Sequence, residues 1–130
     1  MRALPRSDAV AIYKRLYWFK PRFDEVAIQA PALAAELFDT GINMGTGTAT
    51  AFLQRALNAL NREGGDYADL NIDRQIGPAT IAALKAFLRK RGASGESVLL
   101  KAVEALQGAH YIKIAEARPS QEAFVYGWLA

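Results

Sequence analysis

Residues 48–62 read TATAFLQRALNALNR, and the prediction of the fold starts from this stretch. Apolar side chains recur in it every three or four residues, which is the spacing of one face of an α-helix. These side chains are Phe52, Leu53, Ala56, Leu57 and Leu60. The pattern predicts an amphipathic helix over about residues 48–62 that buries this face.

The segments on both sides have the same helical period. Pro31 suits the first position of a helix that runs to about Met44, and the three glycines of residues 41–47 loosen or end it. Further helices are predicted from Ser7 to about Lys20, from Gly77-Pro78 to the break at Gly92, from Ser94 or Ser97 to about Ala117, and from Pro119 to Trp128. Residues 23–30 are expected to form a connector, and residues 70–73 are too few for a sheet. The predicted fold is therefore all-α, one compact domain of about five to six helices.

The composition agrees with a helical domain and excludes several classes of site. The 130 residues include 25 Ala and 14 Leu but only 5 Val and 8 Ile, and Ala and Leu favour helices. The chain has no cysteine and one histidine, His110. Disulfide frameworks, thiol nucleophiles, cysteine zinc sites and Ser-His-Asp catalysis are therefore excluded or disfavoured. No metal and no cofactor is expected.

The charge pattern points away from nucleic acids and membranes. The net charge is +3, and the densest basic run, residues 89–91, falls at a predicted helix end, where cations interact favourably with the helix dipole. No apolar run approaches the roughly 20 residues that span a bilayer. The first six residues also lack the apolar stretch of a signal peptide. We expect no nucleic-acid partner, no membrane span and no signal peptide.

Three polar residues of the predicted helix 31–44 share one face. Glu36, Asp39 and Asn43 are spaced i, i+3 and i+7. A glycosidase needs two carboxyl groups, and an amide can hold a sugar or a water molecule. The same spacing also suits an ordinary solvated face of an amphipathic helix. A ligand-binding role is favoured by the adjacent glycine-rich turn, where a backbone can approach a ligand closely.

The loop of residues 63–69 offers a second set of candidates. Glu63 and Asp66 supply carboxylates there, although Glu-Gly-Gly-Asp is also ordinary turn chemistry. Tyr67 lies in this polar loop and is the best candidate for an exposed, sugar-stacking aromatic. Tyr13, Tyr17 and Trp128 are instead predicted to be in the core.

Four segments of the chain resemble a known family. Residues 37–45, 52–58 and 73–84 resemble the predicted peptidoglycan-binding domain of phage-type endolysins, and residues 118–129 are similar to its closing motif. In that family the domain follows a catalytic module of glycoside hydrolase family 108, an N-acetylmuramidase also described as a secretion activator. Residues 8–18 look like the last helix of that module. The resemblance thus divides the chain into residues 1–20 and residues 21–130.

The resemblance implies a lysozyme-like helical fold, a bacterial or phage (prophage) origin, and peptidoglycan glycan strands as the partner. It implies a protein that stays cytoplasmic until it is released to the cell wall. Asp39 and Asn43 match the family motif and are predicted to contact the glycan. The family's catalytic glutamate belongs to an early Glu-Gly-Gly-Tyr motif that we do not find in this chain. Glu63 begins a similar Glu-Gly-Gly sequence, but at a different position, and the catalytic role is not assigned to it. The leading hypothesis is therefore glycan binding without turnover.

Two alternatives stay open. The chain could be an active peptidoglycan hydrolase that uses Glu36, Asp39 or Glu63, provided that two carboxyl groups lie roughly 5–9.5 Å apart across a groove. It could also be a helical interaction protein that forms homo-oligomers through an exposed apolar surface near its N-terminus. A large exposed apolar patch would favour this second alternative.

Overall fold

The computed structural model describes residues 6–130, with side chains from Asp8 onward. It contains seven α-helices in that range: α1 (Arg6–Lys14), α2 (Phe23–Gln29), α3 (Pro31–Met44), α4 (Thr46–Ala59), α5 (Pro78–Arg91), α6 (Gly95–Ala117) and α7 (Glu122–Leu129). A π-helical segment, Arg15–Phe19, continues α1, and short 3-10 turns lie at Arg62–Gly64, Gly92–Ser94 and Pro119–Gln121. No strand occurs between residues 6 and 130, so the prediction of an all-α fold is confirmed.

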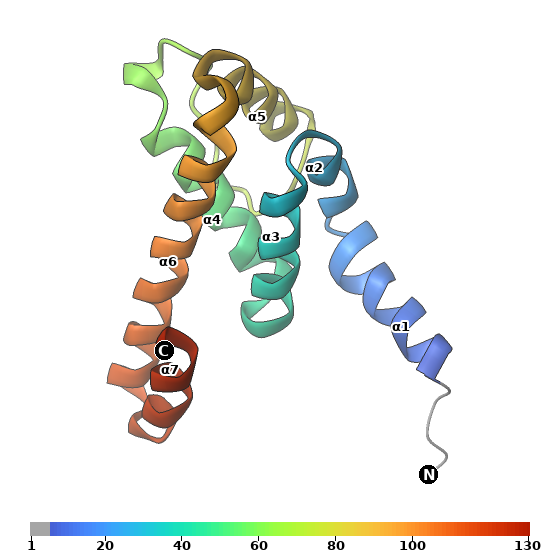
Figure 1. The fold of residues 1–130 in the computed structure, drawn as a ribbon, viewed down its shortest axis with the longest axis vertical. Coiled ribbons are helices and arrows are strands. Elements are labelled where there is room, and N and C mark those ends of the chain that lie inside the picture. Colours follow the sequence, from blue (N-terminus) through green and yellow to red (C-terminus); the bar gives the residue numbers. More distant parts are fainter. Residues whose placement is uncertain (1–5) are drawn as a thin grey trace.

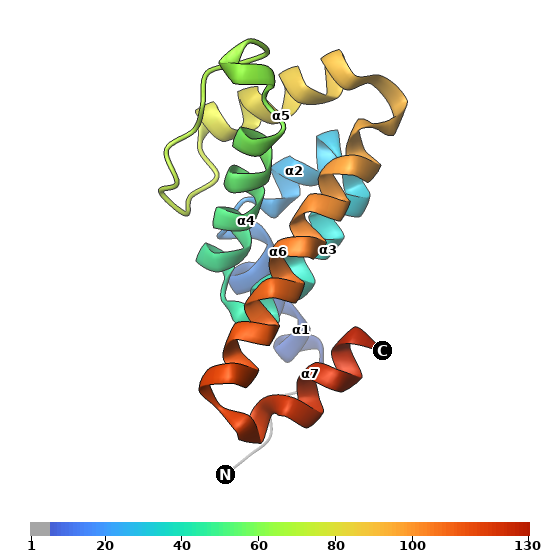
Figure 2. The same ribbon diagram turned by 90° about the vertical axis from the view of Figure 1, so that its left-hand side faces the viewer.

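Helices α3 and α4 form the centre of the molecule, and α6 runs along both of them (Figures 1 and 2). Helix α5 crosses one end of this group, α7 turns back at the opposite end of α6, and α1 leads away from the bundle. The largest fully buried side chains come from α2 to α6; they are Phe23, Leu33, Leu37, Leu53, Leu57, Leu84, Phe87 and Leu99. The predicted apolar face of residues 48–62 thus lies in the core, with Leu60 half-buried at its end.

The turn between α3 and α4 is a single residue, Gly45, with φ of 96°. A side chain is strained in this conformation, so glycine is the residue that fits here. A Cβ on Gly41 would lie 3.1 Å from Cγ2 of Thr46, so the absence of a side chain also lets the two helices approach. At the other end of α3, Glu96 of α6 accepts a hydrogen bond from the Ala32 backbone N–H at 2.9 Å. These contacts fix where α3 starts and stops.

Two helix boundaries differ from the prediction. Residues 23–29 form the helix α2 rather than a connector, because Phe23 and Val26 are one turn apart and both are buried in the core. Helix α4 ends at Ala59 instead of Arg62. Asn61 has left the helical conformation, and its side chain binds the loop that follows.

The predicted core positions of Tyr13 and Tyr17 are only partly correct. Their rings stack at 5.7 Å between centroids, but Tyr13 is 52% exposed. The physical reason is that α1 extends past the ends of the helices that could cover it (Figure 1). Other apolar side chains of this region are also exposed; they are Val10, Leu16 and Phe19. Self-association through this surface stays a prediction.

No helix among residues 6–130 combines the length and the apolar character that a bilayer crossing requires. The same part of the chain has no group of three acidic or histidine side chains that could hold a metal ion. His110 instead packs edge-on against Phe52, with 5.8 Å between ring centroids.

Candidate functional site

A groove of about 370 Å³ lies between the last turns of α3 and the facing sides of α6 and α7. It is lined by Glu36, Asp39, Thr40, Ile42, Asn43, Gln107, Tyr111 and Trp128. The structure thus brings the predicted trio of α3 together with Gln107 and Tyr111 of α6 and Trp128 of α7, which lie far away in the sequence. We call this cavity the polar groove.

The floor of the polar groove is a buried hydrogen-bonded pair. Thr40 and Gln107 are both almost fully buried, and the Gln107 side-chain amide donates a hydrogen bond to the Thr40 hydroxyl. The Thr40 hydroxyl donates in turn to the backbone oxygen of Glu36 at 2.8 Å. Because buried polar groups are costly when unpaired, this pair fixes the register of α3 against α6. The side chains above it are therefore held in place.

Aromatic side chains form the wall of the polar groove. The ring centroids of Tyr111 and Trp128 lie 4.3 Å apart, and Phe124 packs edge-on against Tyr111 with 5.6 Å between centroids. Gly108 of α6 faces the indole, and a Cβ there would make ordinary van der Waals contact with Trp128 at 3.9 Å. Trp128 is nevertheless 36% exposed, which corrects the prediction that it belongs to the core. It packs on Tyr111 of α6 and keeps an open edge at the groove.

The pKa of Glu36 is raised above its ordinary value of 4.5. Partial burial is the main cause, and the negative charges of Glu104 and Asp39 act in the same direction, whereas a hydrogen bond with Gln107 lowers the pKa. Burial also raises the pKa of the Tyr111 phenol, while the Asn43 side chain acts against this change. The groove therefore combines carboxyl groups, amides and aromatic rings, a set that suits a hydroxyl-rich ligand.

Two family models match the chain, and they meet next to this groove. The Predicted Peptidoglycan domain model matches residues 48–130, and the Glycosyl hydrolase 108 model matches residues 1–45. The chain belongs to the Predicted Peptidoglycan domain family. It is thus a peptidoglycan-binding protein related to the endolysin-type muramidases, as the resemblance predicted. The comparison with curated proteins yields no match.

The polar groove is shared between the two matched segments of this peptidoglycan-binding chain. Glu36, Asp39 and Asn43 belong to the segment that matches the hydrolase, whereas Tyr111 and Trp128 belong to the peptidoglycan segment. Neither segment forms the groove by itself. The predicted division after residue 20 stays a prediction.

Glu63 lies apart from the other candidates. It occupies the turn after α4, at the opposite end of that helix from the α3–α4 junction, and its side chain is exposed. Its φ of 54° is in the left-handed region, which only a few residue types adopt readily. The carboxyl groups nearest to it in the chain are those of its own loop, Asp66 and Asp69, and Asp66 is paired with Arg62. Glu63 does not line the polar groove.

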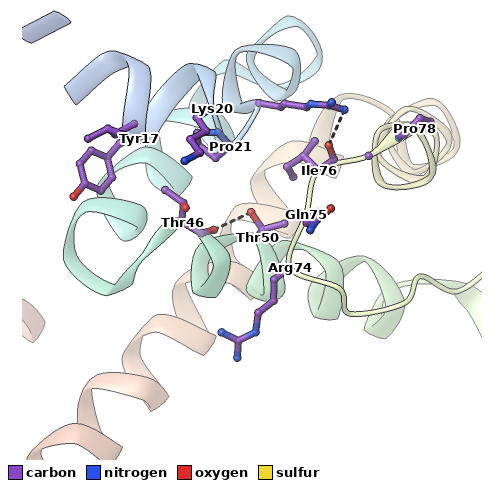
Figure 3. A pocket seen from close by; sticks show the side chains of 12 residues that line it. Tyr17, Lys20, Pro21, Thr46, Thr50, Arg74, Gln75, Ile76 and Pro78 are labelled. Carbon is purple, nitrogen blue, oxygen red and sulfur yellow. Dashed lines mark hydrogen bonds between the residues drawn. The ribbon is translucent and has the colours of Figure 1, made fainter. Parts of the chain in front are cut away.

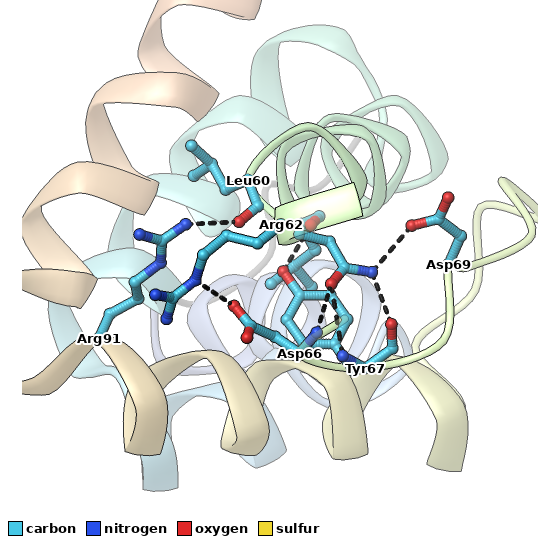
Figure 4. A network of polar contacts seen from close by, with 8 residues as sticks. Leu60, Arg62, Asp66, Tyr67, Asp69 and Arg91 are labelled. Atoms are coloured by element: carbon cyan, nitrogen blue, oxygen red, sulfur yellow. Dashed lines mark hydrogen bonds and ion pairs between the residues drawn. The ribbon is translucent and has the colours of Figure 1, made fainter. Parts of the chain in front are cut away.

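Tyr67 is half-buried, which corrects the prediction of an exposed stacking residue (Figure 4). Its hydroxyl donates a hydrogen bond to the Leu57 backbone oxygen, and its ring packs against the core. Burial is the main reason that the pKa of this phenol is raised to about 12. Tyr67 lines a separate depression between its own loop and α5, so it is not part of the polar groove.

Asn61 explains why the loop folds over Tyr67. Its amide nitrogen donates to the Tyr67 backbone oxygen and to Asp69, and its oxygen accepts from the backbone N–H groups of Asp66 and Tyr67. Arg62 pairs with Asp66 at 2.8 Å on the outside of the same loop (Figure 4). The polar side chains of this loop thus stabilise the fold, and nothing in the sequence distinguishes this role from ligand binding.

The substitution Glu36→Gln is expected to raise the melting temperature at pH 7. A carboxyl whose pKa is raised in the folded protein stabilises the fold while it is protonated, and this contribution is lost as the pH rises through the folded pKa. Glutamine stays neutral, so the gain should disappear at a pH below the ordinary value of 4.5. Thermal unfolding at the two pH values measures this, with Glu116→Gln as the exposed control. An equal gain at both pH values would contradict the electrostatic explanation.

Proposed function

We propose that the polar groove holds a peptidoglycan glycan strand and that the chain binds this strand without cleaving it. The observation that carries the proposal is the convergence of Asp39 and Asn43 with the open edge of Trp128 in one groove. An aromatic face contacts the apolar side of a sugar ring, while carboxylate and amide groups bind its hydroxyls. Thr40 and Gln107 keep the two sides of the groove at a constant spacing.

The position of the carboxyl groups supports binding rather than turnover. A glycosidase places its two carboxyl groups on either side of the scissile bond. The two carboxyl groups that line the groove, Glu36 and Asp39, lie three residues apart on one face of α3. Both therefore approach a bound strand from the same helix.

A second candidate function is hydrolysis with Glu36 as the general acid. The raised pKa of Glu36 favours it, because a general acid must hold its proton close to the working pH. The two functions differ in one measurable consequence, the loss of turbidity of a cell-wall suspension. Removal of one general acid typically lowers a rate by ~10²–10⁴-fold. Glu36→Gln would therefore abolish clearing and leave binding in place if this candidate is correct.

The proposed function is tested by sedimentation of the purified chain with insoluble peptidoglycan, with turbidity followed in the same tubes. The chain is expected to bind and not to clear. Asp39→Ala should weaken binding about tenfold, since hydrogen bonds to a charged group contribute ~1.5–3 kcal/mol. Glu116→Ala, which removes an exposed carboxylate from outside the groove, should bind like the unaltered chain.

Each other outcome has a definite meaning. Clearing that is lost in Glu36→Gln would replace the binding proposal by the hydrolytic one. Binding that is equal in Asp39→Ala and Glu116→Ala would remove the glycan from the polar groove. Absence of both binding and clearing would refute the proposal.

A further inference from the structure

A larger cavity of about 720 Å³ lies on the other side of the α3–α4 turn (Figure 3). Three segments surround it: residues 16–22, the first turns of α4 with Thr46 and Thr50, and residues 74–78. It is therefore also a seam between the two segments that the family models match. We call it the basic groove, because three of its lining residues are Lys20, Arg22 and Arg74.

The charge of the basic groove is not compensated within it. None of its lining residues is Asp or Glu. In the described part of the chain the ion pair is that of Arg62 with Asp66, beyond the far end of α4, so Lys20, Arg22 and Arg74 have no carboxylate partner there. A cavity lined by one sign of charge concentrates ligands of the opposite sign. The basic groove thus favours an anionic ligand.

The three cations are spread along the groove instead of converging on one point. Figure 3 shows Lys20 at the side of the cavity where Thr46 lies, whereas the Arg74 side chain extends away from these two residues. Arg22 reaches toward the 74–78 segment, where it donates a hydrogen bond to the Ile76 backbone oxygen at 3.4 Å. A Cβ on Gly47 would lie 3.6 Å from Arg74 Cβ, so the stem of Arg74 packs across the first turn of α4. This spacing suits an extended ligand with several anionic groups better than a single small ion.

Two of these arginines have a left-handed backbone. The φ angles of Arg22 and Arg74 are 65° and 66°, and in residues 6–130 Glu63 is the third non-glycine residue with positive φ. Such conformations are strained for residues other than glycine and persist where the surrounding structure imposes them, often at ligand sites. Both arginines are among the residues that line the cavity.

The two grooves are close enough to hold one branched ligand. Asn43 lines the polar groove and Thr46 lines the basic groove. Their Cα atoms are three residues apart, hence no more than about 11 Å from each other. An extended peptide of three or four residues spans roughly 10–14 Å. A peptide attached to a glycan in the polar groove would therefore reach the basic groove.

We propose that the basic groove binds the free carboxylates of the peptide stem that the glycan strand carries. This inference rests on the proposed function, because the glycan groove brings the stem into range. Lys20 and Arg74 supply the positive charge that attracts the carboxylates. Arg22 connects residues 20–22 to the 74–78 segment through its hydrogen bond to the Ile76 backbone oxygen. The glycan and its peptide stem would then be bound on opposite sides of the turn between α3 and α4.

The test compares three soluble probes by chemical-shift titration or calorimetry: a disaccharide, the same disaccharide with its peptide stem, and the free stem peptide. The test variant is Lys20→Gln with Arg74→Gln. The matched control is Lys101→Gln with Lys113→Gln, which removes the same charge from exposed positions of α6 outside both grooves. The stem-bearing probe is expected to bind about three- to tenfold more tightly than the disaccharide, since exposed ion pairs contribute ~0.2–1 kcal/mol each. The test variant should lose this gain, and the control should keep it.

The outcomes separate this inference from the proposed function. If the disaccharide does not bind but the free stem shifts residues of the basic groove in the unaltered chain and not in the test variant, the glycan proposal fails and the stem site stands. If disaccharide and stem-bearing probe bind equally, or the test variant equals the control, the stem site is refuted. Binding of a glycerol-phosphate polymer, with no gain from the stem, would assign the groove to phosphate and also overturn the proposal.

Discussion

The substitution Gln54→Leu is expected to lower the free energy of unfolding by about 2–4 kcal/mol, although leucine is apolar and Gln54 lies in the core. The Gln54 amide nitrogen is within 2.8 Å of Asp73 Oδ1, 3.0 Å of the Gln75 backbone oxygen and 3.2 Å of the Thr80 hydroxyl. Its oxygen accepts from the Arg74 backbone N–H at 3.1 Å. Leucine would leave these groups without a partner, some of them buried.

Urea denaturation measures this loss, and Gln75→Leu is the matched control. Gln75 takes part in the same network through its backbone, and its side chain is exposed. Its replacement should therefore change the midpoint little. A similar destabilisation in both variants would show that the segment 73–80 is held by its backbone and not by Gln54.

The pH dependence of the Gln54→Leu effect gives a further check. The hydrogen bond from Gln54, together with that from the Gln75 backbone N–H, lowers the pKa of Asp73 below its ordinary value of 3.8. A carboxyl with a lowered folded pKa stabilises the fold above its ordinary pKa, and the contribution is lost as the pH falls through the folded pKa. The difference between Gln54→Leu and the unaltered chain should therefore narrow below pH 3.8.

The substitution Trp128→Ala is expected to weaken binding to insoluble peptidoglycan about tenfold, which corresponds to ~1.4 kcal/mol of lost contact with the sugar. Trp128 is the side chain that contributes an open aromatic edge to the polar groove. Alanine removes this edge and the packing on Tyr111 together. The measurement is the sedimentation assay, with circular dichroism to confirm that α6 and α7 stay helical.

Two variants separate stacking on the ligand from packing of α7. Tyr126→Ala removes an aromatic ring of the same helix that is 80% exposed and does not line the groove, so it should bind normally. Trp128→Phe keeps an aromatic ring against Tyr111 and should bind with an intermediate affinity. Normal binding by Trp128→Ala would exclude the stacking role.

The polar side chains of α4 and of the loop before α5 show where the sequence pattern stops predicting contacts. Asn61 and Gln54 both follow helical apolar positions, and nothing in their spacing distinguishes them from solvated residues. The Asn61 amide binds the backbone of residues 66–67, five and six residues later, and the Gln54 amide binds the backbone of residues 74–75, which lie 20 and 21 residues later. For this reason Tyr67 was predicted to be exposed, whereas the loop folds it onto the core.

Local periodicity was sufficient for the all-α fold, for the helices other than α2 and for the shared face of Glu36, Asp39 and Asn43, because each depends on residues within a few turns of one another. The tertiary structure was needed for the opposite wall of the polar groove. Trp128 and Tyr111 reach Asn43 because α6 crosses α3 and α7 folds back along it, and no local pattern encodes a contact across more than sixty residues. The unpaired cations of the basic groove likewise line one cavity because residues 16–22 approach residues 74–78. Helix formation is determined by neighbours in the chain, whereas the grooves depend on how finished helices pack.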